Sequence, residues 1–389
     1  MSTRLQKLDK NQKRPSFQTI ALLLQGGGSL GAYQAGVYQA LAEVNIHPDW
    51  VSGTSIGSIN AAIIAGNPPD KRVQKLREFW EYITTQYAPD YLKFFFPDLS
   101  KGDIARSYLN EMSSIATALR GVNGMFKPWP FSPWFQWSGT SEARSYYDNA
   151  ELKETLLRFI DFNRINSEKI RLSIGAVNIR SGNSVYFDTT THNISPEHIM
   201  ASCALPPGFP PVEIEGEPYW DGGLISNTPL QWVLDGSPCE DTLIFQVDLW
   251  SARGNLPRNM PEVMTRLKEI QYSSRTRSNT ERFRDIQKMR YAVANFLDAL
   301  PDNLKEIPEA EFLQSIAIRK IYNIIHLIYR PKNYEGHSKD YEFSRLSMED
   351  HWDAGYFDTI HTLRHPESLE RHVDREPVLT FDFTKDGAD

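Results

Sequence analysis

Two short apolar runs near the start of the chain each lead into a glycine-containing turn and then into a helical pattern. The residues from Ile20 to Leu24 are continuously apolar, as in a buried parallel strand, and they are followed directly by Gln25 and three glycines. From Leu30 to Val44 the apolar residues recur at helical spacing. A second unit follows, with a short strand at Trp50-Val51 and a helix of small residues from Ser58 to Ala65. Two strand, turn and helix units in succession predict an α/β fold.

The rest of the chain continues this mixture of strands and helices. Helices are predicted at 68–87, 102–119, 149–162, 195–202, within 260–300 and at 345–363. Strands are predicted at 170–177, 183–187, just before Asp221, at 242–249 and at 322–329. The charge-rich helices after Trp250 suggest that a large first domain is followed by a separate, mostly helical region.

The second turn, Gly53-Thr54-Ser55-Ile56-Gly57, has the G-x-S-x-G spacing of a nucleophile elbow. A serine hydroxyl is a weak nucleophile unless it is exposed, aimed and paired with a base, and a sharp strand-to-helix turn supplies the first two. Glycines at 53 and 57 allow that turn and the close approach of the helix. Ser55 is therefore the candidate nucleophile, although an N-capping serine is the ordinary alternative.

The first turn is a candidate anion site, because its backbone N–H groups lie at the start of a helix. The N–H groups of Gly26, Gly27 and Gly28 could stabilise the oxyanion formed when a serine attacks an ester. The same Gly26-x-Gly28-x-x-Gly31 pattern also matches a dinucleotide-binding turn, with Asp49 as the acidic partner. However, Asp49 precedes the second strand instead of ending it, which disfavours nucleotide binding.

A candidate base comes much later in the chain. Asp221 ends a short predicted strand and is followed by Gly222-Gly223, where the backbone can bend away and leave the carboxylate facing a cleft. An aspartate in a turn is also a common structural residue, so this position alone does not establish a role.

Composition narrows the function classes. The 389 residues carry a formal charge of −7, which argues against nucleic acid as a partner. Two cysteines, Cys203 and Cys239, offer neither a disulfide framework nor a metal cluster, so no metal or cofactor is expected. The polar, basic segment 1–16 is expected to be a flexible tail without a signal peptide, and the protein is expected to be cytoplasmic.

One segment, from residue 88 to 147, is rich in aromatic residues and prolines. The run GMFKPWPFSPWFQWSG alternates the two, and its prolines are expected to exclude a regular strand or helix. The aromatic side chains could be packed into the protein or against a partner subunit, which leaves a homo-oligomer open. They could equally form a lid that borders an apolar substrate groove or a peripheral contact with a membrane surface.

The three motifs GGGSLG, GTSIGS and ASCALPPGFPPVEIEGEPYWDGGLISNTP, in this order, resemble the patatin-like phospholipases. The resemblance covers roughly residues 17–250. It implies an open three-layer α/β/α sheet and a Ser-Asp dyad of Ser55 and Asp221. It further implies an oxyanion hole at Gly26, Gly27 and Gly28, with Gly53, Gly57 and Gly222 supporting the turns. Where the family usually has arginine in GGGxRG, this chain has Leu30, which weakens inferences based on that arginine but leaves the backbone donors intact.

The resemblance also implies the organisation and substrates of the protein. Residues 17–254 would form the catalytic domain, and 255–389 looks like the C-terminal extension of a bacterial subgroup, for which no separate activity is implied. Family members are lipid acyl hydrolases, so a lipid or another hydrophobic acyl ester is the implied substrate. Hydroxyalkanoate oligomers or thioesters remain alternatives, and so does a non-catalytic protein that binds lipid or nucleotide through the glycine turn.

Overall fold

The computed structural model describes residues 14–84, 102–167, 169–236, 240–273, 276–317, 319–372 and 376–383. The predicted flexible tail 1–16 lies outside the described residues except for 14–16. The first part of the aromatic segment, with the end of the helix predicted at 68–87, and Cys239 also lie outside them.

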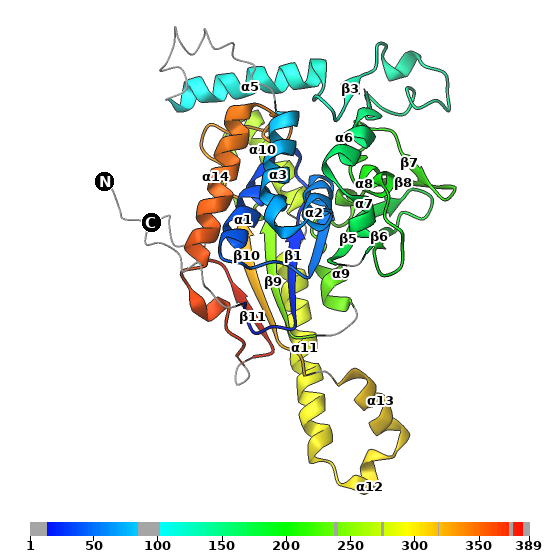
Figure 1. Ribbon diagram of the computed structural model, residues 1–389, viewed down its shortest axis with the longest axis vertical. Helices are drawn as coiled ribbons and strands as arrows, with labels where there is room; N and C mark the ends of the chain where they lie inside the picture. The colour runs from blue at the N-terminus through cyan, green and yellow to red at the C-terminus, as the bar shows by residue number, and fades with distance from the viewer. Residues whose placement is uncertain are drawn as a thin grey trace.

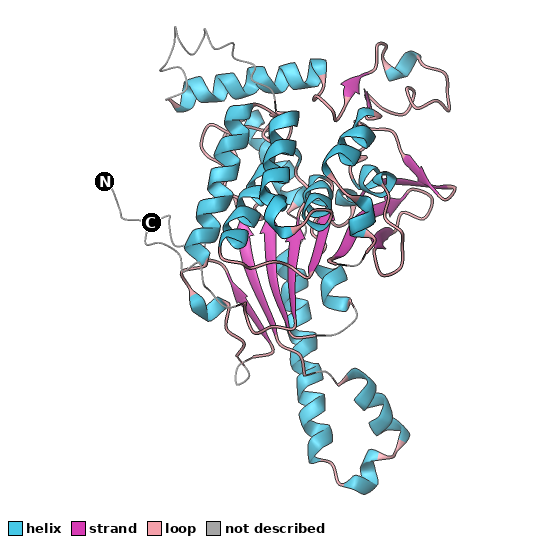
Figure 2. Ribbon diagram, viewed as in Figure 1, coloured by secondary structure: helices cyan, strands magenta, loops and turns pink. Residues whose placement is uncertain are grey.

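A single large sheet forms the centre of the described chain (Figure 2). Its path runs β11-β10-β9-β1-β2-β5-β8-β7, and β6 pairs with β5 beside this path. The strands from β11 to β5 are parallel, while β6, β7 and β8 are antiparallel to their neighbours. The strand bounds are β1 Thr19–Leu24, β2 Trp50–Thr54, β5 Arg171–Asn178, β6 Ser184–Asp188, β7 Val212–Ile214, β8 Glu217–Asp221, β9 Thr242–Asp248, β10 Tyr322–Ile328 and β11 Val378–Phe381.

Helices cover both faces of this sheet (Figure 1). The main α-helices are α1 Ala32–Glu43, α2 Ile56–Ala65, α3 Pro69–Ile83, α5 Asp103–Arg120, α6 Glu151–Phe159, α7 Phe162–Ile165, α8 Pro196–Ser202, α9 Leu230–Asp235, α10 Met260–Tyr272, α11 Thr276–Ala299, α12 Asp302–Lys305, α13 Pro308–Ile316 and α14 Arg345–Thr362. Short 3-10 turns lie at η1 Gly28–Gly31, η2 Pro133–Phe135, η3 Gly222–Leu224 and η4 Pro366–Ser368.

Alternate residues of the central strands feed two separate cores. In β1, Leu22 and Leu24 pack with α1 and α2, whereas Ala21 and Leu23 pack with α9 and Phe283 of α11. All four side chains are fully buried. This is the pattern of a parallel strand with helices on both sides, so the predicted three-layer α/β/α architecture is confirmed.

The region after residue 255 is mostly helical, as predicted, but it also extends the sheet. β10 pairs with β9 along its whole length, and β11 pairs with β10. Helix α14 packs closely on α1, where a Cβ on Gly36 would lie 1.9 Å from the carbonyl oxygen of Trp352. The extension therefore shares its core with the N-terminal part of the chain.

Most of the predicted elements are confirmed, including the strand at 322–328 and the helix at 345–362. The expectation that prolines exclude regular structure from the aromatic segment is wrong in two places. The two-residue strand β3 (Lys127–Pro128) pairs with β4 (Tyr147–Asp148), and η2 begins at Pro133, where a missing N–H costs nothing. Among the described residues, no helix is both long and apolar enough to span a membrane.

Candidate active site

Ser55 occupies a strained turn between β2 and α2. Its backbone angles are φ 55° and ψ −129°, which few residues with a side chain adopt. The turn closes only because glycines flank it: a Cβ on Gly53 would lie 2.3 Å from the carbonyl oxygen of Gly57, and one on Gly57 would lie 2.2 Å from that of Leu24. The local structure is the sharp strand-to-helix elbow that the motif predicted.

A residue that sequence analysis missed holds this turn in place. The N–H of Ser55 donates to Oγ of Ser202 at 3.0 Å, and the Ser202 hydroxyl donates to the carbonyl oxygen of Gly175 at 2.6 Å. Ser202 is completely buried at the end of α8. Its signal in the sequence was its place as the second residue of the motif ASCALPPGFPPVEIEGEPYWDGGLISNTP, which leads to Asp221.

Strand β5 brings Ser55 and Asp221 together. Thr54, the last residue of β2, pairs with Gly175, and the next residue of β5, Ala176, pairs with Asp221 at the end of β8. β8 thus pairs with the same edge of β5 as β2 does, and its pairing begins at the position after the one where the pairing of β2 ends. Because Gly175 and Ala176 are consecutive in β5, their partners Thr54 and Asp221 lie next to each other, and Ser55 directly follows Thr54.

The Asp221 carboxylate is buried and hydrogen-bonded. It accepts a bond from the N–H of Gly223 at 2.7 Å, and the Ser55 side chain lies close enough to lower its pKa. Only 1% of Asp221 is exposed, and this burial raises its pKa to about 7, although the N–H of Gly223 and the side chain of Ser55 oppose the shift. Gly222 lets the chain turn away, since a Cβ there would lie 2.7 Å from the carbonyl oxygen of Gly175.

The glycine turn after β1 lies beside Ser55 and is held from several sides. Both backbone polar groups of Gly26 are hydrogen-bonded. Its N–H donates to the carbonyl of Asn227 at 3.3 Å. Its carbonyl oxygen accepts from Asn227 Nδ2 at 2.9 Å and from Trp250 Nε1 at 3.0 Å. Of the three N–H groups proposed from sequence, that of Gly26 therefore already has a partner. The N–H groups of Gly27 and Gly28 have no acceptor among the described residues, and both glycines line the cavity.

Ser55 and Asp221 open into a cavity of about 450 Å³. Its lining is largely apolar and comes from α2, α5, the aromatic segment, the loop before β7 and the C-terminal region: Ile56, Ile59, Thr117, Ala118, Met125, Phe126, Tyr147, Leu205, Phe209, Trp250, Tyr272, Tyr341 and Phe343 are among its members. Phe126, Tyr147 and Phe209 form an aromatic cluster with ring centroids 5.0 to 6.0 Å apart. The inner aromatic residues of the segment thus form part of the cavity wall.

The cavity wall contains no histidine among the described residues. His198 instead caps its own helix through Ser195, and His326 lies in β10 near Asp248. Cys203 lines the cavity, but burial raises the pKa of its thiol and keeps it neutral. The lining groups that carry negative charge are Asp221 and Asp340, and Asp340 is paired with Lys268 at 2.8 Å.

Asp49, the residue that a dinucleotide site would require, lies at the opposite end of the sheet. Its carboxylate accepts the N–H of Ile20 at 2.8 Å and is paired with Arg14. It therefore ties the start of β1 to the start of β2, far from the glycine turn. The described residues also contain no group of three potential metal ligands.

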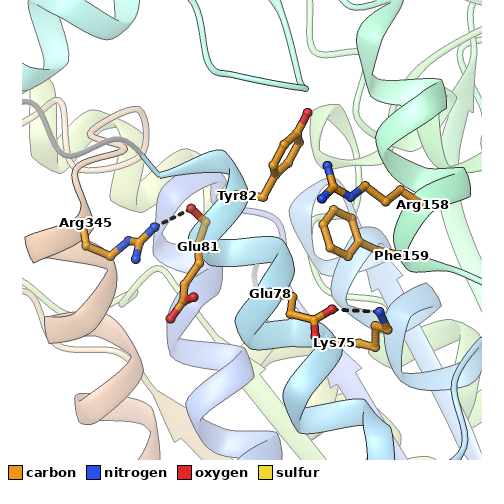
Figure 3. Close-up of a pocket in the computed structure, with 7 residues that line it drawn as sticks. All are labelled: Lys75, Glu78, Glu81, Tyr82, Arg158, Phe159 and Arg345. Carbon is orange, nitrogen blue, oxygen red and sulfur yellow. Dashed lines mark hydrogen bonds and ion pairs between the residues drawn. The ribbon is translucent and has the colours of Figure 1, made fainter.

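A second cavity of about 460 Å³ lies on the outside of the molecule between α3, α6 and the start of α14 (Figure 3). Lys75 is paired there with Glu78 at 2.8 Å, and the Arg158 guanidinium lies over the rings of Tyr82 and Phe159. Arg345 donates to the carbonyl oxygen of Glu81. The charged groups of this second cavity are paired with neighbouring residues, and among the described residues the cavity contains no serine or cysteine nucleophile. Although its volume is similar to that of the cavity at Ser55, it is not a competing active site.

Comparison with known proteins identifies the family. The model of a family described as patatin-like phospholipase matches residues 22–234, more than half of the chain. The chain belongs to the patatin-like phospholipase family. A second model, described as patatin phospholipase, matches residues 270–375, so the C-terminal region is itself a recognised part of patatin-like proteins.

The relatives are much longer than the region of similarity. A lysophospholipase of Candida glabrata is 27% identical over 243 residues, which are 62% of this chain and 11% of that protein. Patatin-like phospholipase domain-containing protein 6 of Homo sapiens is 42% identical over 72 residues, covering 18% of this chain and 5% of that protein. This patatin-like chain thus spans about a tenth or less of these relatives. Among solved structures, VipD from Legionella pneumophila covers 95% of this chain and 72% of its own, with a TM-score of 0.37 and 14% identity.

Proposed function

We propose that this patatin-like protein is a serine acyl hydrolase that cleaves carboxylic esters of fatty acyl chains through a dyad of Ser55 and Asp221. The observation that carries the proposal is that Ser55 and a buried carboxylate line the same apolar cavity, with the Ser55 side chain close enough to lower the pKa of Asp221. A nucleophile in direct contact with a base needs no intervening histidine. An apolar cavity of this volume suits an acyl chain.

The proposed reaction has two halves. Ser55 Oγ attacks the ester carbonyl carbon while its proton passes to Asp221, and a tetrahedral oxyanion forms. The N–H groups of Gly27 and Gly28 stabilise that charge. Asp221 then gives the proton to the departing alkoxide as the carbon–oxygen bond breaks, which leaves an acyl-serine. Water, deprotonated by Asp221, attacks the acyl-serine, and the fatty acid leaves as the proton returns to Ser55.

The pKa of Asp221 suits this exchange. A carboxylate with its ordinary pKa would be a very weak base at neutral pH, whereas burial raises the pKa of Asp221 to about 7. The carboxylate can therefore accept a proton from Ser55 and return it within one turnover.

The experiment uses the full chain and a Ser55→Ala variant as the blank. A fluorophosphonate probe should label the wild-type protein and leave Ser55→Ala unlabelled, and a panel of acyl esters of increasing chain length should be hydrolysed only by the wild type. Thioesters and hydroxyalkanoate oligomers belong in the panel as alternative substrates. Labelling of Ser55→Ala, or equal hydrolysis by both proteins, would refute the proposed nucleophile. Because the proposed chemistry uses no metal, EDTA should leave the rate unchanged.

A further inference from the structure

Helix α5 is amphipathic in the reverse sense to an ordinary surface helix. Its inward face is polar and almost completely buried, and consists of Arg106, Asn110, Ser113, Ser114 and Thr117. Its outward face carries large apolar side chains that are 48 to 71% exposed, namely Tyr108, Met112, Ile115 and Leu119. A helix at the surface of a soluble protein normally places these two classes the other way round.

The buried polar face is only partly satisfied. Arg106 donates to Asp350 at 2.8 Å, and Asn110 accepts a hydrogen bond from Ser347, both in α14. However, Ser113 Oγ and Thr117 Oγ1 have no hydrogen-bond partner among the described residues. The orientation of α5 is therefore costly on its inner side and leaves an apolar stripe uncovered on its outer side. Such a stripe is a feature of surfaces that bind something apolar.

The loop between β3 and β4 adds to this surface. Phe131, Trp134, Phe135 and Trp137 are 73 to 88% exposed. Figure 1 shows this loop and α5 at the same end of the molecule, opposite the α12 and α13 hairpin. Trp and Phe side chains on a protein surface are typical of contacts with the boundary between lipid head groups and acyl chains.

The outward face of α5 is continuous with the cavity that contains Ser55. Thr117 and Ala118 of α5 line that cavity, and Ala118 is also exposed, so the cavity reaches the surface beside Leu119. A protein seated on this stripe would cover the route to Ser55, whereas a lipid surface would deliver substrate to it. Residues 102–148 contain four acidic and four basic side chains, so their formal charge is zero. An anionic lipid surface would require an excess of Lys and Arg here, and a zwitterionic one does not.

We propose that the outward face of α5 (Tyr108, Met112, Ile115 and Leu119) and the exposed aromatic residues of the neighbouring loop form a docking surface for aggregated zwitterionic lipid. This inference rests on the proposed function, because it treats the cavity as the acyl site. It goes further because α5 and the loop would hold the opening of the cavity against a bilayer or micelle.

The test compares binding to vesicles with hydrolysis of a soluble ester. Two independent pairs of substitutions, Met112→Ser with Leu119→Ser and Trp134→Ser with Trp137→Ser, remove exposed apolar groups that do not line the cavity. The matched control is Met289→Ser with Phe312→Ser, two side chains of α11 and α13 that are 59% and 67% exposed. Trp129 is left intact, because it is partly buried and donates to Ser145 at 3.0 Å.

Each test pair should lower co-sedimentation with phosphatidylcholine vesicles, and hydrolysis of vesicle lipid, by about tenfold. Hydrolysis of a short soluble ester should stay within about twofold of wild type, and the control pair should change neither measurement. Unchanged vesicle binding in both test pairs would overturn the proposal, and so would equal losses on vesicles and on the soluble ester. A wild-type dimer that dissociates in both pairs would show that a second copy occupies the surface instead.

The Ser55→Ala protein separates this inference from the proposed function. It should bind vesicles as wild type does while hydrolysing neither substrate. If it binds vesicles and still hydrolyses the esters, the proposed nucleophile is wrong and the docking surface stands. If it is inactive and neither it nor the wild type binds vesicles, the docking surface is wrong and the nucleophile stands.

Discussion

The backbone carbonyl of Asp340 accepts a hydrogen bond from the N–H of Ser29 at 2.9 Å, so a residue of the C-terminal region rests directly on the glycine turn. The Ser29 hydroxyl also donates to the carbonyl of Lys339 at 2.6 Å. A Cβ on Gly28 would lie 2.0 Å from the Asp340 carbonyl oxygen, which explains why that position needs glycine in addition to its φ of +56°. The C-terminal region therefore forms one wall of the candidate active site.

The first prediction concerns the ion pair that holds this wall. Lys268 Nζ contacts both carboxylate oxygens of Asp340, at 2.8 and 2.9 Å, and the carbonyl of His337 at 3.0 Å. Lys268→Met should lower kcat on a short ester by about tenfold with a smaller change in KM, because a displaced turn holds the oxyanion donors less well. Steady-state kinetics on a soluble ester measure this split.

Two comparisons test whether Lys268 acts by positioning. Lys268→Arg keeps the charge and should restore most of kcat. Lys153→Met removes an ion pair with Glu197 of comparable length, 2.6 Å, away from the cavity, and should leave kcat unchanged. Equal losses in Lys268→Met and Lys153→Met would mean that only general stability had changed.

The second prediction concerns Ser202. Ser202→Ala removes the acceptor of the Ser55 N–H and leaves that partly buried donor without its partner. Because the elbow is already strained, we expect kcat/KM to fall by about ten- to a hundredfold while Ser55 still reacts slowly with a fluorophosphonate. Labelling rates follow the nucleophile directly. A wild-type labelling rate in Ser202→Ala would show that the elbow keeps its geometry without this bond.

The third prediction is a pH dependence. Asp221 must be ionised to accept the proton of Ser55, and its pKa is raised to about 7 by burial. For a soluble ester, kcat/KM should therefore rise with pH up to about 7 and then level off. Initial rates between pH 5 and 9 define the midpoint. A rate that is flat between pH 5 and 8 would contradict a base with this pKa.

The sequence predicted the parts of the site whose chemistry is local. Glycines that permit a sharp turn and an apolar run that ends at them can be read without a structure, so Ser55 and Gly26 to Gly28 could be proposed from the pattern. What the sequence could not provide was strand register, which is set by packing across the whole sheet. The family resemblance implied the pair of Ser55 and Asp221, but the strand register that places both residues at the same edge of β5 came only from the structure.

Residues that act through tertiary contacts were missed for the same reason. Ser202 belongs to the third motif, but the motif does not show which hydrogen bonds its hydroxyl makes, and Asp340 lies in a loop with no motif. Helix α5 was predicted within one residue of its bounds, but its amphipathic pattern alone would have placed its apolar face inward. The contact of Arg106 with Asp350 reverses that orientation, and it depends on a helix more than two hundred residues later.

The last prediction joins activity and stability at Asp221. Asp221→Asn keeps the shape of the side chain and an oxygen that can accept from Gly223, but it has no basic lone pair for the proton of Ser55. We expect kcat to fall by about a thousandfold or more. His192→Ala, His198→Ala, His326→Ala and His351→Ala should each retain most of the activity. A loss in one of these as deep as that of Ser55→Ala, with Asp221→Asn active, would replace the dyad with a histidine-based triad.

The same substitution should stabilise the fold in a pH-dependent way. An aspartate in the unfolded chain has a pKa of 3.8, whereas the pKa of Asp221 in the folded protein is about 7, so folding favours the protonated acid. The stabilising contribution of this group is complete below about pH 4 and is lost as the pH rises through 7. Relative to wild type, the free energy of unfolding of Asp221→Asn should therefore increase between pH 4 and 7 and level off above, by about 2 to 4 kcal/mol. Urea unfolding at pH 5 and pH 8 measures the difference. If the wild-type protein instead gained stability over Asp221→Asn as the pH rises, Asp221 would be ionised throughout this range. Its pKa would then not be raised, and its proposed role as the base would be refuted.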